Sequence, residues 1–196
     1  MSESVVFKYP ENLKPENMAR KKFNGQNHSI SGVCSDFCHA FSSVIISGVN
    51  NRGSSPDWLI NRLSKFGQKT ISPLVDISNY FMFLLGRPSH IFDMDKICKK
   101  EQILEIRKGN ANEKLVLLNG DEIENLADTI IIADSTGPLA LAGIMGGRST
   151  MVTANTTNIL VESAVWLPSL IRGKARRFSL SSEAASRFEK GVDPET

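Results

Sequence analysis

One carboxylate stands out among the residues whose types could do chemistry. Glu162 lies within residues 159–166, a stretch that is otherwise mostly apolar. On a strand with alternating side chains it would point outward into solvent. Pointing inward, it would place a carboxylate in a pocket, where a buried polar group needs a hydrogen-bond donor or destabilises the fold. The residues alone leave both interpretations open.

His90 is the second candidate. It follows a helix stop, in the segment RPSHIFD at 87–93. An imidazole titrates near neutral pH, so it is suited to proton transfer or to polar contacts in a binding site. The alternative is a loop histidine without a function, and the sequence does not separate the two.

A glycine-rich run, GIMGG at 143–147, could in principle cradle a phosphate. It lacks the Lys-Ser/Thr ending of a P-loop and the GxGxxG order of a dinucleotide site. The run therefore favours a bend or bulge where backbones approach closely, although such a backbone can also lie against a ligand. Ser181 and Ser182 are interpreted as helix caps, and the amides at a helix N-terminus can also receive an anionic or carbonyl group.

The cysteines and the other histidines predict no metal site. Cys34 and Cys38 are separated by three residues, His39 adjoins them, and no second Cys or His pair stands at ligand spacing. We interpret the cysteines as structural. Their odd number, three, argues against a disulfide framework and for a reducing, cytoplasmic compartment.

The charge pattern limits how the chain could contact nucleic acid. The formal net charge is only +2, whereas a protein that held nucleic acid by electrostatics alone would be far more basic. Between residues 172 and 190, however, six basic residues face two acidic ones. This stretch is either a solvated helix face or an edge that contacts phosphates. Its basic residues are Arg172, Lys174, Arg176, Arg177, Arg187 and Lys190.

Helices are expected on both sides of a strand-rich middle. A strand is predicted at 40–46, a helix at 56–66 capped by Ser55, and a second, largely buried helix at 76–85. From residue 102 the period changes to two, and Asn119-Gly120-Asp121 predicts a hairpin between 114–118 and 122–123. Further strands are expected at 129–133 and 158–161, and helices at 168–177 and 183–190.

This order predicts an α+β fold with mixed or antiparallel sheets and flanking helices, packed as one compact domain. The 196 residues suit one such core, and no apolar run in the sequence is long enough to cross a membrane. Residues 1–37 are interpreted as an N-terminal extension or linker, because polar and basic residues dominate there, and residues 38–196 as the domain.

Several motifs in one order resemble the central editing domain of the beta subunit of bacterial-type phenylalanyl-tRNA synthetase. The resemblance covers roughly residues 38–196. The motifs that carry it are SPDWL at 55–59, VDISNY at 75–80, GRPSHIFDMDK at 86–96, GPLALAGIMGG at 137–147, LVESA at 160–164, ARR at 175–177 and SRFEKGVDP at 186–194.

The resemblance implies hydrolysis of tyrosine wrongly attached to phenylalanine tRNA. It implies that Glu162 receives the tyrosine hydroxyl, that Gly146 lies beside that hydroxyl, and that His90 stands at the reacting end. Ala184 matches a small residue that leaves room for substrate. Ser182 stands where the family commonly has threonine and keeps a hydroxyl at the site, while Ser181 replaces a frequent histidine. We expect a positioned water to attack the ester, assisted by a ribose hydroxyl of the tRNA.

The resemblance also implies partners and a competing function. The partners would be the acceptor end of tRNA(Phe), contacted by Arg172, Lys174, Arg176 and Arg177, and a synthetase alpha subunit in an alpha2-beta2 heterotetramer. No cofactor is expected in this segment, while the parent enzyme would use ATP and magnesium and act as a ligase in the cytoplasm. The alternative is a non-enzymatic structural or tRNA-docking module whose editing has decayed, suggested by the changes at Ser181 and Ser182.

Overall fold

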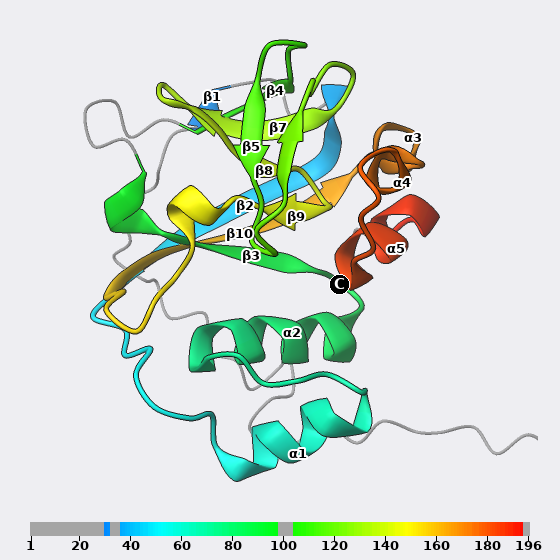
Figure 1. The fold of residues 1–196 in the computed structure, drawn as a ribbon. Helices are drawn as coiled ribbons and strands as arrows, with labels where there is room; N and C mark the ends of the chain where they lie inside the picture. The colour runs from blue at the N-terminus through cyan, green and yellow to red at the C-terminus, as the bar shows by residue number, and fades with distance from the viewer. Residues whose placement is uncertain (1–29, 32–35, 98–103, 194–196) are drawn as a thin grey trace, which may run out of the picture.

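The computed structural model describes residues 30–31, 36–97 and 104–193 (Figure 1). Most of the predicted extension at 1–37 lies outside this part of the chain, as do Cys34, Cys98 and His28. Cys38 is described and is 1% exposed, so it is a core residue as expected for a structural cysteine.

The larger sheet has five strands in the order β1-β4-β7-β8-β9. Only the β1–β4 pairing is parallel, so the sheet is mixed. All five residues of β7 are buried, because the strand lies in the middle of the sheet and of the core. The strands are β1 (Ile30–Ser31), β4 (Leu104–Lys108), β7 (Ile130–Asp134), β8 (Gly137–Leu141) and β9 (Met145–Gly146).

The smaller sheet carries the candidate site. Its order is β2 (Cys38–Ser47), β10 (Asn158–Trp166) and β3 (Ser89–Asp93), all antiparallel. Alternate residues of β10, namely Leu160, Ala164 and Trp166, belong to the same buried cluster as the central strands of the larger sheet. The two sheets therefore share one core.

A separate hairpin confirms the turn predicted at Asn119-Gly120-Asp121. It pairs β5 (Lys114–Val116) with β6 (Glu122–Glu124) in antiparallel register. Gly120 has φ +93°, a backbone conformation that glycine adopts without strain.

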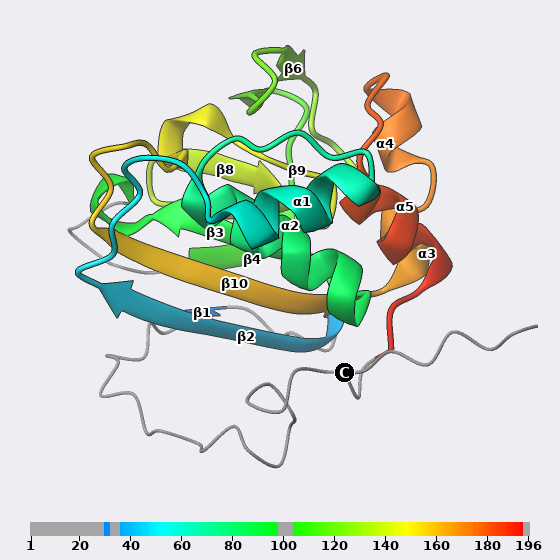
Figure 2. The ribbon, with the colours of Figure 1, turned by 90° about the horizontal axis from the view of Figure 1, so that it is seen from below.

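Two helices form a layer beneath β3, which Figures 1 and 2 show from two sides. They are α1 (Asp57–Lys65) and α2 (Pro73–Leu85), and Gly86 ends α2 with φ +76°. The predicted cap at Ser55 is wrong, because no side chain caps α1. The Ser55 hydroxyl instead donates a 2.6 Å hydrogen bond to the buried carboxylate of Asp76.

The expectation that the second helix is largely buried is also wrong. Of its residues only Asp76 and Met82 are buried, whereas Ile77, Phe81 and Leu85 are exposed. The reason is that α2 packs on β3 along one side and on α1 along another, and these two contacts leave the remaining part of its surface uncovered by described residues.

The C-terminal helices gather at one end of the sheets (Figure 1). The single helix predicted at 168–177 is two short ones, α3 (Pro168–Ile171) and α4 (Lys174–Arg177), because Gly173 between them has φ +77°. The last helix, α5 (Glu183–Lys190), has the predicted bounds and the predicted cap at Ser182.

Together these elements confirm the predicted α+β class with mixed and antiparallel sheets and flanking helices. Among the described residues, no helix combines the length and apolar character that a bilayer crossing requires.

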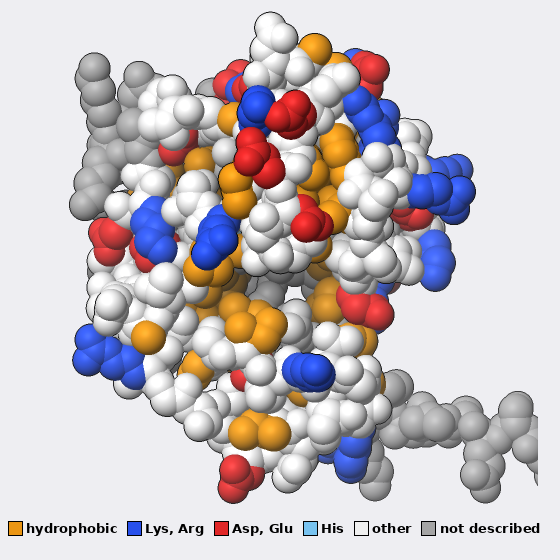
Figure 3. All heavy atoms as spheres, in the orientation of Figure 1, with side chains coloured by type: hydrophobic (Ala, Val, Ile, Leu, Met, Phe, Trp, Pro, Cys, Tyr) orange, Lys and Arg blue, Asp and Glu red, His pale blue; other side chains and the backbone are white. Residues whose placement is uncertain are grey.

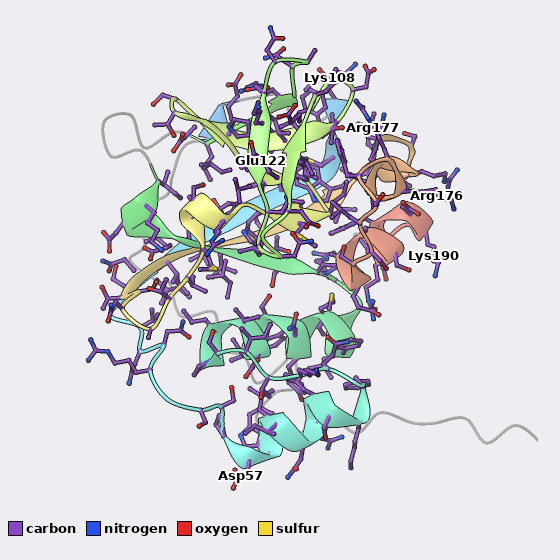
Figure 4. The ribbon with its side chains drawn as sticks, in the orientation of Figure 1. Asp57, Lys108, Glu122, Arg176, Arg177 and Lys190 are labelled. Carbon is purple, nitrogen blue, oxygen red and sulfur yellow. The ribbon has the colours of Figure 1, made fainter. Side chains whose placement is uncertain are left out.

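We predict that Asp76 holds the helical layer together. Its carboxylate accepts hydrogen bonds from the Ser55 hydroxyl and, at 2.8 Å, from the Ile71 amide. Asp76→Ala leaves both donors without this acceptor, and the buried Ser55 hydroxyl left unpaired costs about 1–3 kcal/mol. Urea unfolding followed by circular dichroism should show that loss. Asp57→Ala, at the exposed start of α1 (Figure 4), is the control and should cost less than about 1 kcal/mol. Equal losses in both variants would contradict the prediction.

Candidate ligand-binding site

The register between β3 and β10 places the two candidate residues side by side. Glu162 pairs directly with His90, and Leu160 pairs with Phe92 two residues further along. Directly opposed residues on antiparallel strands project to the same face, with Cβ atoms about 5 Å apart. The carboxyl and the imidazole are therefore neighbours on one face of the smaller sheet.

Glu162 faces the interior and not solvent. It shares the face of β10 with Leu160 and Ala164, and only 6% of its surface is exposed. Its carboxyl makes no hydrogen bond or ion pair with any other described residue. Burial raises the pKa of this carboxyl from 4.5 to about 8, so the group is mostly protonated at pH 7. Of the two interpretations left open by the sequence, the inward one is correct.

The His90 ring is held among uncharged groups. It meets the Phe92 ring edge-on at a centroid distance of 4.4 Å. Burial lowers the pKa of His90 from 6.5 to about 4, so the imidazole is neutral at pH 7. At that pH the pair is a neutral imidazole beside a largely neutral carboxyl.

Gly146 provides the surface on which His90 packs. A Cβ atom at this position would lie 2.6 Å from Nε2 of His90, which is far inside van der Waals contact. The predicted close approach of backbones is found at Gly147, where a Cβ atom would clash with the Leu139 carbonyl oxygen. The preceding residues form β9, where Gly146 pairs with Ala140.

A narrow cavity of about 70 Å³ opens beside this pair. Glu162, His90 and Gly146 line it, and α5 contributes Ala184 and Phe188. Apart from the carboxyl and the imidazole, its walls are mainly apolar. Such a cavity suits a small apolar group that carries one hydrogen-bonding atom. The structure thus brings together four of the five residues predicted for the site.

Ser182 is the one that does not line this cavity. Its hydroxyl donates to the Ile144 carbonyl at 2.8 Å and accepts from the Ala185 amide at 3.1 Å. These bonds tie the start of α5 to the turn between β8 and β9. Ser182 therefore positions the cavity walls, and its catalytic role stays a prediction.

The basic residues predicted to contact tRNA differ in their bonding. The Arg177 guanidinium donates to the carbonyls of Ala127 and Asn125, at 2.6 and 2.9 Å, so it braces the segment between β6 and β7. Arg172 donates more weakly, at 3.4 Å, to the Glu189 carbonyl. Figure 4 shows Arg176, Arg177 and Lys190 on the same side of the molecule. Neither Lys174 nor Arg176 has a polar partner among the described residues.

Trp166 and Phe188 also line the cavity and were not predicted as site residues, although their spacing from predicted ones indicates them. Trp166 lies four residues after Glu162 on the same strand, so it projects to the same face. Phe188 lies four residues after Ala184, which places both on one face of α5. As for metals, no group of three or more His, Cys, Asp or Glu side chains gathers among residues 30–31, 36–97 and 104–193.

Fold and cavity together define a class: an α+β domain with a small cavity lined by apolar groups around one buried carboxyl. A family model described as the B3/4 domain matches residues 37–196, and the chain belongs to that family.

Curated relatives are phenylalanine–tRNA ligase beta subunits. That of Burkholderia pseudomallei (strain 1710b) is 52% identical over 162 residues, covering 82% of this chain and 20% of the relative. That of Francisella tularensis (subsp. tularensis, strain SCHU S4 / Schu 4) is 44% identical over 163 residues, covering 83% and 20%. The chain therefore spans about a fifth of the length of these relatives.

A solved structure has the same fold. It is an N-terminal fragment of the phenylalanyl-tRNA synthetase beta-subunit from Pyrococcus horikoshii, with a TM-score of 0.52. The match covers 87% of this chain and 52% of that one at 16% sequence identity, so it supports the fold alone.

We predict that Gly146→Ala destabilises the chain through its clash with His90. Forcing a methyl into this contact should cost about 1–3 kcal/mol in urea unfolding. In a His90→Ala background the ring is gone, so the same change should cost much less. A double-mutant cycle measures the difference. An equal cost in both backgrounds would show that some other contact requires the glycine.

A second prediction concerns pH. Between pH 4.5 and 8 the native chain keeps a proton on Glu162 that the unfolded chain releases, so stability falls as pH rises. His90 acts in the opposite direction between pH 4 and 6.5, where only the unfolded chain binds its proton. The two effects oppose each other below pH 6.5, and the Glu162 effect stands alone from there to pH 8.

Glu162→Gln should remove this fall. Urea unfolding at several pH values from 6.5 to 8 measures the free-energy difference between Glu162→Gln and the unchanged chain. The free energy of unfolding of Glu162→Gln minus that of the unchanged chain should increase with pH, by no more than about 1.4 kcal/mol per pH unit. The exposed Glu122→Gln variant is the control and should follow the unchanged chain. A difference that stays constant with pH would refute a buried protonated carboxyl.

Proposed function

We propose that this chain is an editing module that hydrolyses tyrosine from mischarged tRNA(Phe). The observation that carries the proposal is the buried, unpartnered Glu162 carboxyl at the wall of an apolar cavity, in a chain whose curated relatives are phenylalanine–tRNA ligase beta subunits.

The cavity supplies a physical basis for choosing tyrosine. A synthetic pocket built for phenylalanine rejects an added hydroxyl only weakly, by something on the order of a hundredfold. Here a phenylalanine ring would leave the Glu162 carboxyl buried without a partner, whereas a tyrosine hydroxyl would pair with it. A carboxyl that is mostly protonated can both donate to and accept from that hydroxyl. The second site therefore reverses the preference of the first.

Hydrolysis itself needs little from the side chains around the cavity. Water attacks the ester carbonyl, the bond to the ribose oxygen breaks, and free tyrosine and deacylated tRNA are released. The neutral His90 imidazole can accept a hydrogen bond from the water or orient the ester. The Ser182 hydroxyl is already bonded to Ile144 and Ala185, which argues against a covalent serine intermediate.

The proposal extends to the parent protein. As part of a phenylalanine–tRNA ligase, the chain would act in the cytoplasm, and the parent would assemble with an alpha subunit as an alpha2-beta2 heterotetramer. ATP and magnesium would serve the ligase reaction at a different site of that enzyme. Arg172, Lys174 and Arg176 would contact the acceptor end of tRNA(Phe), with Arg177 contributing charge from its braced position.

One observation favours a second candidate, a tRNA-docking module that no longer edits. Because Ser182 is occupied as a cap and His90 has a lowered pKa, no strong base or nucleophile faces the cavity among the described residues. A module of this kind would retain the basic residues between 172 and 190 and lose selectivity for tyrosine.

Glu162→Ala should abolish the preference for tyrosine. We expect the ratio of deacylation rates for Tyr-tRNA(Phe) and Phe-tRNA(Phe) to fall about 5- to 150-fold, because the paired buried group is removed. Glu162→Gln should retain more of the ratio, since an amide still donates and accepts. The matched control is Glu122→Ala at an exposed position (Figure 4). Both substrates are followed by release of labelled amino acid. An unchanged ratio in Glu162→Ala would reject the assignment, and no deacylation by the unchanged chain would favour the docking module.

Ala184→Trp should block the cavity without touching the carboxyl. The indole would fill space that the alanine methyl leaves open, so tyrosine deacylation should drop at least tenfold. Ser186→Trp, on an exposed position of the same helix, controls for the added aromatic surface. Undiminished deacylation by Ala184→Trp would place the substrate elsewhere.

A further inference from the structure

A second cavity shares His90 with the first. Its volume is about 170 Å³, and it lies between α2 and the sheets. Figure 3 shows the surface hollowed between this helical layer and the body above it, with apolar side chains in the hollow. Ser89 and His90 line both cavities, so the two meet at these residues.

The walls of the second cavity fit a flat, uncharged ring. It is lined by no Asp, Glu, Lys or Arg side chain, which disfavours a phosphate or a metal ion. A cavity of about 150 Å³ lined by apolar side chains is large enough for benzene. Apolar walls on several sides give a ring surfaces to pack against; they are Val75, Ile91, Leu118, Met151 and Val152.

The Asn79 side chain gives the cavity a hydrogen-bonding group. The Asn79 amide lines it and makes no hydrogen bond with another described residue. The neighbouring Ser78 hydroxyl, in contrast, already bonds to Ser89, at 2.9 Å to its hydroxyl and 3.2 Å to its carbonyl. A side-chain amide presents an acceptor beside a donor, and this pattern pairs with the N6 and N7 edge of adenine.

We propose that the second cavity binds the terminal adenine of the aminoacylated tRNA, with Asn79 reading the N6/N7 edge of the base. The inference rests on the proposed function, in which tyrosine occupies the first cavity. Every tRNA ends in adenosine, and its ribose joins the base to the amino acid. A substrate with its ester at His90 would then place its amino acid in one cavity and its base in the other.

The test compares stable substrate analogues. In 3′-deoxy-3′-(tyrosylamino)adenosine an amide replaces the ester, and the matching inosine compound lacks the N6 amino group. Calorimetry should show that the unchanged chain binds the adenosine compound about tenfold or more tightly than the inosine compound. Asn79→Ala should bind the two equally, while Asn61→Ala, at an exposed position of α1, should keep the preference. Equal binding of both compounds by the unchanged chain, or an undiminished preference in Asn79→Ala, would overturn the proposal.

Two further measurements separate this inference from the proposed function. Tyrosine amide, which lacks a base, should bind the unchanged chain and Asn79→Ala equally, and this also verifies that the variant is folded. Adenosine alone should shift the methyl NMR signal of Met151 in the unchanged chain, with no variant needed. Binding of adenosine without tyrosine amide would refute the editing function and retain the base site. The reverse result, with Met151 unmoved, would refute the base site alone.

Discussion

The antiparallel register of β3 and β10 is the constraint on which the site depends, because it places Glu162 opposite His90 on the buried face. Side chains on a strand alternate, so a slip of one residue would turn the carboxyl outward and bring Val161 or Ser163 into its place. The register is supported at its far end, where the Thr156 hydroxyl donates a 2.6 Å bond to the buried Asp93. Much of the smaller sheet thus serves to keep one carboxyl inside the fold.

A buried carboxyl is costly, and the surroundings of Glu162 show how the fold accommodates it. No cation or hydrogen-bond donor among the described residues pairs with the Glu162 carboxyl. Burial instead raises the pKa of this carboxyl to about 8. The same apolar surroundings lower the pKa of His90 to about 4. The His90 ring packs closely on the Gly146 backbone, where a Cβ atom would clash with it. Glu162 and His90 are therefore an uncharged pair at pH 7, and both line the cavity with polar atoms that can still form hydrogen bonds.

Local patterns in the sequence predicted much of this fold, and tertiary packing decided the rest. Asn119-Gly120, the cap at Ser182 and the apolar run around Glu162 are local signals, and the structure confirms the elements they predict. The prediction of a single helix at 168–177 was wrong because Gly173 adopts a positive φ, which the spacing of apolar residues does not reveal. The direction of Glu162 and its pairing with His90 depend on contacts between strands some 70 positions apart, which spacing alone does not encode.

In the proposed function, the Glu162 carboxyl recognises the phenolic hydroxyl of tyrosine. A crystal structure of this chain soaked with tyrosine and, in parallel, with phenylalanine would test this recognition. We expect tyrosine in the first cavity, with its phenol oxygen within hydrogen-bond distance of the Glu162 carboxyl, and no phenylalanine at the same concentration. Tyrosine bound away from Glu162, or phenylalanine bound equally well in the same pose, would contradict it.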